Sequence, residues 1–566
     1  MLLILFIYLI YKIFTQIKPA NIGATKLTAM RKLFFAITLC FAAFLISCGP
    51  SQQEIDYAKT EARIIPQPNK INYTGGALVL EKKFGISVTD PSLKSIAEAL
   101  KEDLSKYAGV EAELVKENAS IIISKSTKGT PESYTLDIND KTATITAPDE
   151  AGAFYATRSL LLMFPDKTKT IQKTVLPSAK IEDAPRYGWR GVMLDESRHF
   201  FGKKKVMQIL DMMALHKLNK FHWHLTDEPG WRLEIEKYPK LTTEGGKGSY
   251  CQPSDPAKFY TKKDIREVLD YASARFIEVI PEIDMPGHAT AANRAYPEFS
   301  GGGSERYPDF TFNPGNPATY AYLEDILKET ADLFPSHYLH YGGDEVHFGN
   351  HEWKTDRHVK ALMKKEKLAD IKQVEQYFNR RMADYIKSLG HVTMGWDEIV
   401  NAGVQPDNAV VMWWRHDRPK DLATAMRKGY KTILCPRVPL YFDFVQDSTH
   451  QVGRRWGGKF GDLAGVYNYP QMPVEIKGLD ESLIMGIQGN VWTEQIQTEK
   501  RLDFMLFPRM TALSEAAWTQ KEAKDFDNFG HRLKLTLPVY KREKIDYFDP
   551  FKPESTPEPE GCKKPA

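Results

Sequence analysis

Two adjacent acidic residues, Asp344-Glu345, are the feature of the sequence best suited to chemistry. They follow two glycines at the end of a short run of mostly apolar and aromatic residues. A carboxyl group held beside a reacting atom can donate or accept a proton. Because neighbouring side chains at the end of a strand tend to diverge, we expect these two carboxyl groups to have separate roles and not to face each other across a reacting bond.

Polar and aromatic residues also gather beside seven other short β-rich runs. Arg190 leads into the first run, and Asp195 and Arg198-His199 follow it. The later clusters lie within residues 222–227, 281–288, 395–398, 413–415, 441–443 and 492–494. Any one of them could be structural, but clusters in equivalent positions along the chain indicate one shared site.

The β-rich runs themselves predict the fold of residues 185–548. They are residues 191–195, 219–225, 276–281, 338–342, 392–396, 409–413, 431–435 and 484–489, and amphipathic stretches separate them. Strands that alternate with helices in this way predict an α/β fold, a (β/α)8 TIM barrel. Since the active site of such a barrel lies at the carboxyl ends of its strands, we expect the polar clusters to meet there.

Residues 64–184 predict a small α+β domain before the barrel. Short strand-like runs lie at 78–80 and 121–123, a hairpin-like alternation spans 134–147, and a helical pattern spans 150–163. This domain contains no reactive cluster, so we expect it to be non-catalytic. The Pro, Glu and Lys residues of 549–566 predict a disordered tail.

The N-terminal region has the pattern of an export signal. Residues 30–48 begin with a short positive segment, continue with an apolar one and end at Cys48, as in a bacterial lipoprotein signal. We expect Cys48 to be lipidated, residues 49–63 to form a tether, and the protein to be exported and anchored to a bacterial membrane, periplasmic or at the cell surface. An ordinary secretory signal with an incidental Cys48 is the alternative.

Residues 1–29 carry a separate apolar stretch ahead of this complete signal. We interpret them as a mis-annotated upstream extension, with a genuine transmembrane helix as the alternative. Over the whole chain of 566 residues the formal net charge is +3 and no basic run resembles a nucleic-acid-binding patch, which argues against a nucleic-acid partner. The five cysteines show no CxxC spacing, which argues against a disulfide framework or a zinc ribbon.

Taken together, the motifs resemble glycoside hydrolase family 20, the β-N-acetylhexosaminidases, from Ile64 to about Phe548. The matching motifs are Trp189-Arg190-Gly191, Leu194-Asp195, Arg198-His199-Phe200, the runs 222–227 and 281–288, Gly342-Gly343-Asp344-Glu345, Gly395-Trp396-Asp397-Glu398 and Trp492-Thr493-Glu494. The resemblance implies removal of terminal, non-reducing, β-linked N-acetylhexosamine (GlcNAc or GalNAc) from a glycan, with retention of configuration. It also implies substrate-assisted catalysis through an oxazolinium ion, with no cofactor and no metal.

The resemblance also implies a role for each matched residue. Glu345 would be the general acid and then the general base, and Asp344 would orient the substrate's acetamido group. Substrate binding would use Arg190, Trp396, Trp414, Tyr441, Asp443, Trp492 and Glu494, with Arg190, Asp443 and Glu494 on sugar hydroxyls. Asp227, Asp284 and His288 would tune Glu345 from behind.

Three other functions compete with this one. His222 and His224 share one face of a strand, as in a metal-dependent amidohydrolase, but no further His-bearing strand end completes a binuclear site. The run from Gly342 to Glu345 resembles the GGDE core of diguanylate cyclases, but Val346 follows where Phe is expected. A non-catalytic sugar-binding homologue would have lost the acid or a wall residue, and all are present.

Overall fold

The computed structural model describes residues 50–165 and 173–562. The expected export signal, with Cys48, and the upstream extension therefore lie outside the described residues. Within the described ranges, no helix combines the length and the apolar character needed to cross a membrane.

Eight parallel strands form a closed barrel, which confirms the predicted fold class. They are β8 (Trp189–Asp195), β9 (Lys220–His224), β10 (Glu278–Met285), β11 (Tyr338–Gly342), β12 (Val392–Trp396), β13 (Ala409–Trp413), β14 (Lys431–Leu434) and β15 (Ile484–Val491). The barrel closes where β15 pairs with β8, from Gly486 opposite Trp189 to Val491 opposite Leu194. The third strand begins later and ends later than expected, so the run from Glu282 to Met285 belongs to the strand itself.

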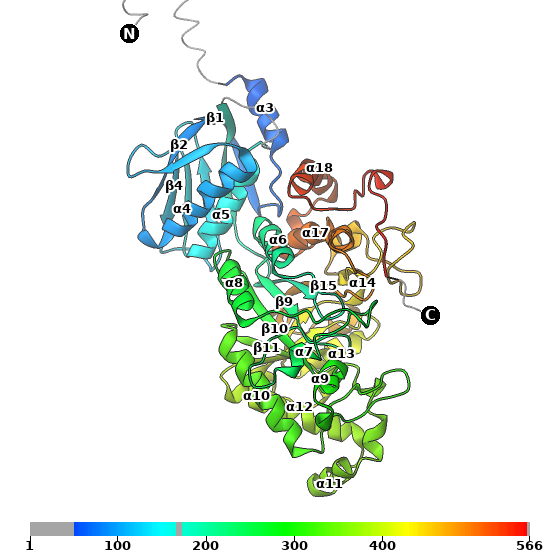
Figure 1. The fold of residues 1–566 in the computed structure, drawn as a ribbon. Coiled ribbons are helices and arrows are strands. Elements are labelled where there is room, and N and C mark those ends of the chain that lie inside the picture. Colours follow the sequence, from blue (N-terminus) through cyan, green and yellow to red (C-terminus); the bar gives the residue numbers. More distant parts are fainter. Residues whose placement is uncertain (1–49, 166–172, 563–566) are drawn as a thin grey trace, which may run out of the picture.

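Helices surround this barrel (Figure 1). The longer ones are α6 (Lys203–Leu215), α8 (Lys262–Ser273), α10 (Pro317–Leu333), α11 (Arg357–Glu366), α12 (Ile371–Ser388), α13 (Pro419–Arg427), α16 (Glu499–Leu506), α17 (Arg509–Trp518) and α18 (Phe526–Arg542). Short helices lie in the loops: α7 (Lys240–Thr243), α9 (Thr290–Ala295), α14 (Arg437–Leu440) and α15 (Leu463–Asn468). α8 shows why such helices form: Thr261 caps its first turn, and Ile265, Val268 and Ala272 make a buried stripe toward the barrel.

The N-terminal domain is a seven-stranded mixed sheet in the order β1-β7-β5-β6-β4-β2-β3. Its strands are β1 (Lys70–Glu81), β2 (Lys83–Val88), β3 (Glu111–Leu114), β4 (Ile121–Lys125), β5 (Tyr134–Ile138), β6 (Ala143–Ala147) and β7 (Lys173–Asp183), and its main helices are α4 (Lys94–Asp103) and α5 (Glu150–Met163). α5 is buried along almost its whole length because its Phe154 also packs on Phe276 of the barrel, with ring centroids 5.2 Å apart. The two domains therefore share one continuous core (Figure 1).

The structure shows ordered elements in the expected tether and in the segment expected to be a disordered tail. The expected tether contains helix α3 (Gln52–Glu61), which begins with a Ser51 capping box and buries Ile55. The expected disordered tail is folded as far as Cys562, which forms a disulfide with Cys251. The sequence argued against a disulfide framework and did not indicate this single disulfide, because 311 residues separate the two cysteines and the fold brings them together.

Candidate active site

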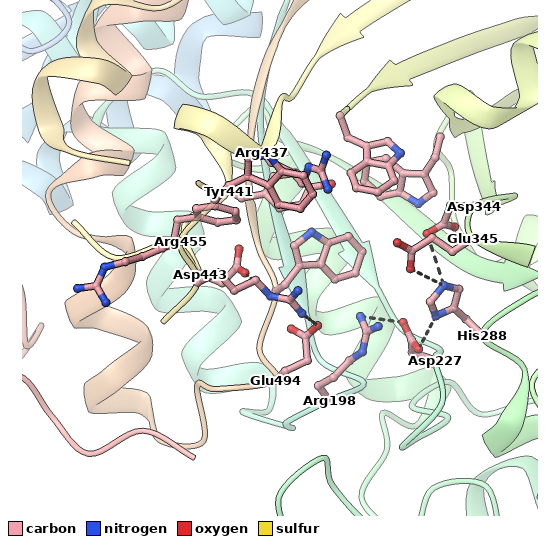
Figure 2. A pocket seen from close by; sticks show the side chains of 16 residues that line it. Arg198, Asp227, His288, Asp344, Glu345, Arg437, Tyr441, Asp443, Arg455 and Glu494 are labelled. Atoms are coloured by element: carbon pink, nitrogen blue, oxygen red, sulfur yellow. Dashed lines mark hydrogen bonds and ion pairs between the residues drawn. The ribbon is translucent and has the colours of Figure 1, made fainter. Parts of the chain in front are cut away.

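A cavity of about 360 Å³ lies at the carboxyl end of the barrel, where the strand-end clusters were expected to meet. Its lining consists of Arg198, Asp227, His288, Asp344, Glu345, Trp396, Trp414, Arg437, Tyr441, Asp443, Phe444, Arg454, Arg455, Trp456, Trp492 and Glu494. Figure 2 shows these side chains converging from many different loops. Apart from Arg190 and Asp284, the structure brings together every residue of the barrel that we expected to act on substrate or behind Glu345.

The turn after β11 explains how Asp344 and Glu345 reach this cavity. Gly342 has φ +72° and Gly343 has φ +90°, values in the left-handed region that favours glycine. A Cβ on Gly342 would lie 1.9 Å from Asp284 Oδ1, so no other residue fits. Glu345 itself has φ +49°, and a strained non-glycine residue of this kind is typical of active sites. The turn therefore places two successive carboxyl groups in one cavity.

His288 lies between this acidic pair and Asp227 (Figure 2). Its Nε2 is 3.5 Å from Asp344 Oδ2 and 3.7 Å from Glu345 Oε2, and its Nδ1 is 3.0 Å from Asp227 Oδ1. Burial alone would lower the pKa of His288, but Asp227 and Asp344 hold it well above its usual range. The ring is therefore a cation beside both carboxyl groups.

Burial favours the protonated forms of the acidic pair. It raises the pKa of Asp344 to about 8 and also raises the pKa of Glu345, while the charge of His288 opposes both shifts. A carboxyl group that stays protonated near neutral pH can act as a general acid. This is the property that the expected role of Glu345 requires.

Asp227 anchors the other side of His288. Arg198 Nη1 lies 2.8 Å from Asp227 Oδ2, and His224 Nε2 lies 2.9 Å from the same oxygen. Burial would raise the pKa of Asp227, but these cations keep it well below its usual range. Asp284 lies behind the Gly342 turn and does not line the cavity; burial and the neighbouring Asp344 raise its pKa well above the usual range.

The expectation for Arg190 was wrong. Its side chain is fully buried near the amino end of β8, where it donates to both carboxylate oxygens of Glu132 at 2.9 and 3.0 Å. The cavity is at the opposite end of the strand, about 17 Å away for five residues of extended chain. Of these two arginines, Arg198, which follows β8, is the one that lines the cavity. Strand direction distinguishes the two, because residues that lead into a barrel strand lie on the stability face.

The expected aromatic residues form a wall of the cavity. The ring centroids of Trp492 lie 5.8 Å from Trp396 and 6.1 Å from Tyr441, and Trp414 stacks on Tyr441 at 6.3 Å. The Trp396 indole N–H donates to Glu282 at 2.9 Å, and that of Trp414 donates to Glu398 at 3.0 Å. These bonds fix the ring planes before any ligand binds.

Asp443 and Glu494 lie across the cavity from Asp344 and Glu345 (Figure 2). Arg454 bridges them: its Nε is 3.0 Å from Asp443 Oδ2 and its Nη2 is 2.5 Å from Glu494 Oε1. Burial raises the pKa of Asp443 to about 7, whereas Arg454 and Arg198 outweigh burial and lower that of Glu494. Among the described residues, Asp443 Oδ1 and Glu494 Oε2 have no hydrogen-bond or ion-pair partner, and Asp443 Oδ2 has only its ion pair with Arg454, so each carboxylate keeps at least one oxygen for a ligand.

Six residues of the lining were not predicted from the sequence to act in the site. Besides Arg198 they are Arg437, Phe444, Arg454, Arg455 and Trp456. The run from Arg454 to Trp456 is a basic and aromatic cluster between the seventh and eighth strands, and it carried the signal that could have found these residues. The run was not assigned to the site because it lies far in sequence from the ends of both strands.

Comparisons with known proteins agree with this geometry. Residues 187–521 match the model of the glycosyl hydrolase family 20 catalytic domain, and residues 61–184 match domain 2 of the same family. The chain belongs to glycosyl hydrolase family 20. It is therefore a glycoside hydrolase, and the amidohydrolase alternative is not favoured; His222 and His224 lie inside the barrel at 3.0 and 2.6 Å from Glu282.

Individual members of the family resemble the chain over most of its length. A β-hexosaminidase of Porphyromonas gingivalis is 32% identical over 542 residues, which cover 92% of this chain and 69% of that protein. A solved β-N-acetylhexosaminidase of Bacteroides fragilis is 31% identical with a TM-score of 0.76, covering 86% of this chain and 96% of that one. An exo-β-N-acetylglucosaminidase of Vibrio harveyi, solved with N-acetylglucosamine, is 30% identical with a TM-score of 0.79, covering 87% and 79%.

Proposed function

We propose that this cavity removes one terminal, non-reducing, β-linked N-acetylhexosamine at a time, with the substrate's own acetamido group as the nucleophile. The observation that carries the proposal is the adjacency of Asp344 and Glu345 in one cavity beside His288. Two-carboxylate glycosidases place their acid and their nucleophile or base about 5 to 9.5 Å apart across the scissile bond. A neighbouring pair is suited instead to one proton-transfer group and one group that serves the substrate.

Glu345 is the proton-transfer group in this proposal. In the first step its carboxyl proton passes to the glycosidic oxygen as the bond from C1 to that oxygen breaks. In the second step its carboxylate takes a proton from water, whose oxygen forms the new bond to C1 as the bond from C1 to the acetamido oxygen breaks. The raised pKa of Glu345 supports the first step, and the charge of His288 stabilises the carboxylate that remains.

Asp344 serves the acetamido group. Its carboxyl group would accept the amide N–H, which increases the electron density on the carbonyl oxygen as that oxygen bonds to C1. The product is a cationic oxazolinium ring, and a positive charge beside Asp344 favours its ionised form. Attack within one bound molecule has a large effective molarity, so no protein nucleophile is needed. Displacement at C1 by the amide and then by water retains the configuration.

The remaining lining suits the rest of the sugar. Trp396, Trp414 and Trp492 would enclose the acetamido methyl group and the apolar face of the ring, and the Tyr441 hydroxyl would donate to the acetamido carbonyl oxygen. Arg198, Asp443 and Glu494 would bind the sugar hydroxyls. A cavity with charged groups around these hydroxyls accommodates a chain end, which supports exo action.

Hydrolysis of aryl β-GlcNAc, β-GalNAc and β-Glc by the wild type tests the central claim. We expect cleavage of at least one N-acetylated substrate and essentially none of the β-glucoside, which lacks the nucleophile. Asp344→Asn should slow the acetamido substrates, and a thiazoline mimic of the bicyclic intermediate should inhibit the wild type strongly. Rapid cleavage of the β-glucoside, or a thiazoline that does not bind, would refute substrate assistance.

We also propose that the protein is exported and held at a bacterial membrane by a lipid on Cys48. The positive and apolar residues of 30–48 and their terminal cysteine support this proposal. Expression of the wild type and of Cys48→Ser in a bacterium, followed by metabolic labelling with a fatty acid, tests it. We expect label and membrane association in the wild type alone; equal labelling of the two proteins would contradict lipidation at this residue.

A further inference from the structure

The C-terminal segment 549–562, here called the C-terminal strap, packs on the face of the barrel that carries the active site. Figure 1 shows the chain, in red, leaving α18 and running toward the C-terminus beside the loops at this end. Cys562 is buried and bonded to Cys251, which lies in the loop that follows β9. Cys251 Sγ is 3.7 Å from the carbonyl oxygen of Glu494, and the Cys562 N–H donates to the carbonyl of Gln495 at 3.4 Å. The strap therefore ends against the backbone of a cavity residue.

Glu558 of the strap holds the loop that contains Arg454. Its carboxylate accepts the backbone N–H groups of Gln451 at 2.6 Å and of Val452 at 3.0 Å. Arg501, fully buried on α16, donates to the same carboxylate at 3.1 Å and to the carbonyl of Val452 at 2.7 Å. Bonds to an ionised group are stronger than those between neutral partners, so this clamp fixes the loop two residues before Arg454.

The clamp is also closely packed. A Cβ on Gly561 would lie 2.4 Å from Val452 Cγ1 and 2.9 Å from Arg501 Nε, so strap and loop touch without a gap. Beyond Val452 the loop reaches Arg454, whose backbone N–H donates to the carbonyl of Asp443 at 3.0 Å. The Arg454 side chain, about half exposed at 53%, then bridges the carboxylates of Asp443 and Glu494. Within the part of the chain that the structure describes, two ion pairs hold that side chain across the cavity, so its direction depends on the position of the loop.

We propose that the C-terminal strap is a positioning element for sugar binding: through Glu558 and the Cys251–Cys562 disulfide it fixes the loop of Arg454, which aims the free oxygens of Asp443 and Glu494 at the sugar hydroxyls. The inference rests on the proposed function, because it assigns those two carboxylates to hydroxyl binding. It makes Arg454 a positioning residue, since Arg454 occupies one oxygen of each carboxylate and leaves the other free. Loss of the strap should therefore weaken ground-state binding and leave the chemical step unchanged.

Kinetics of Glu558→Gln on an aryl N-acetylhexosaminide that the wild type cleaves test the proposal. The amide of Gln can accept only one of the two backbone N–H groups, so the loop loses one of its bonds. We expect KM to rise about tenfold while kcat stays within about twofold of the wild-type value. This is the result expected when a hydrogen bond to a charged group is lost and that bond contributes only to substrate binding. Arg454→Ala should raise KM at least as much. Arg454→Lys, whose ammonium can pair with only one of the two carboxylates, should have a KM between that of Arg454→Ala and that of the wild type.

Glu560→Gln is the matched control. Glu560 is exposed, lies two residues from Glu558 on the same strap, and has no hydrogen bond or ion pair that the structure records. The KM of Glu560→Gln should equal that of the wild type. A KM that is unchanged in Glu558→Gln, or one that rises equally in Glu560→Gln, would overturn the positioning role.

Two further measurements separate positioning from general loss of structure. On substrates without the 4- or the 6-hydroxyl, the KM penalty of Glu558→Gln should shrink, because the misplaced carboxylates have less to bind; an undiminished penalty would contradict the proposal. Cys562→Ser should show the same KM effect with a lower Tm, and if it does not fold, Glu558→Gln with its intact disulfide still decides. A wild type inactive on every N-acetylhexosaminide would instead refute the proposed function.

Discussion

At the scale of single residues, the site depends on burial and on one imidazole. Glu345 and Asp344 are both pushed toward their protonated forms by burial, and His288 is the nearest cation that opposes this shift. Asp227 keeps His288 charged, and Arg198 and His224 keep Asp227 ionised. A chain of alternating charges therefore sets the proton affinity of the general acid.

The pH dependence of kcat/KM should reveal this chain. The general acid must be protonated, so the rate falls as pH rises through the pKa of Glu345. Removing the cation in His288→Asn disfavours the carboxylate, raises that pKa further and should move the alkaline limb to higher pH. His337→Asn, an exposed histidine that precedes β11, should leave the profile unchanged. A limb that moves to lower pH in His288→Asn would show that His288 does not stabilise the carboxylate.

Loss of the acid has a second signature. Glu345→Gln should lower kcat/KM by about 10² to 10⁴ for substrates with poor leaving groups, the usual contribution of general acid catalysis. The loss should be smaller for an aryl substrate with a good leaving group, which departs without a proton. Comparison of a nitrophenyl glycoside with an N-acetylhexosamine disaccharide measures the difference. Equal losses on the two substrates would contradict the assignment of Glu345 as the acid.

At the scale of elements, the turn after β11 is the part of the barrel on which the chemistry depends most. It turns the chain through two left-handed glycines, so that Asp344 and Glu345 both enter the cavity although neighbouring strand residues normally point apart. Space allows only glycine at Gly342, because Asp284 lies directly behind it. β11 brings Asp344 and Glu345 to the carboxyl end of the barrel, and the glycine turn directs both side chains into the cavity.

Gly342→Ala should remove most activity. Its new Cβ would overlap Asp284 Oδ1, so the turn must move, and misplacement by about 1 Å can cost about 10² in rate. Gly390→Ala is the matched control: its φ is also positive, at +85°, but nothing lies within 4 Å of the added Cβ. The control should lose about 1 kcal/mol of stability at most and keep its kcat/KM. Measurement of Tm and kcat/KM for both variants separates backbone strain from displacement of the acidic pair; equal kcat/KM losses would contradict this explanation.

At the scale of the whole molecule, buried charges join the N-terminal domain to the bottom of the barrel. Arg190 of β8 pairs with Glu132, and Lys217 pairs with Asp183 at 3.1 Å, with both Lys217 and Asp183 side chains fully buried. The Trp518 indole N–H also donates to Asp183 at 3.0 Å. These contacts support the barrel from the face opposite the active site.

Arg190→Met should therefore mainly lower stability, and Arg198→Met should mainly lower activity. Arg190→Met removes one partner of a buried pair and should cost about 3 kcal/mol or more of stability, with kcat/KM of the folded protein nearly unchanged. Arg198→Met should lower kcat/KM strongly, because it removes a cavity residue that holds Asp227. Denaturant unfolding and steady-state kinetics of both variants check this. A large rise of KM in Arg190→Met would restore that residue to the substrate site.

The barrel, its eight strands and most of the cavity lining could be predicted from the amino-acid sequence. Strand ends such as Asp344-Glu345 and Trp396 were recognisable because a parallel barrel collects them at one face whatever the loops do. The expected walls and hydroxyl-binding carboxylates lie together for the same reason.

The three-dimensional structure was needed to show which distant loop adds Arg454 to the cavity and how the C-terminal segment is held. Arg190 and Arg198 lie at opposite ends of β8, so the rule that a barrel's active site lies at the carboxyl ends of its strands was sufficient to choose Arg198. Arg454, Glu558 and the Cys251–Cys562 bond are brought together by contacts between segments far apart in the chain. Local patterns carry no information about such contacts, because the closure of long loops depends on the packing of the whole fold.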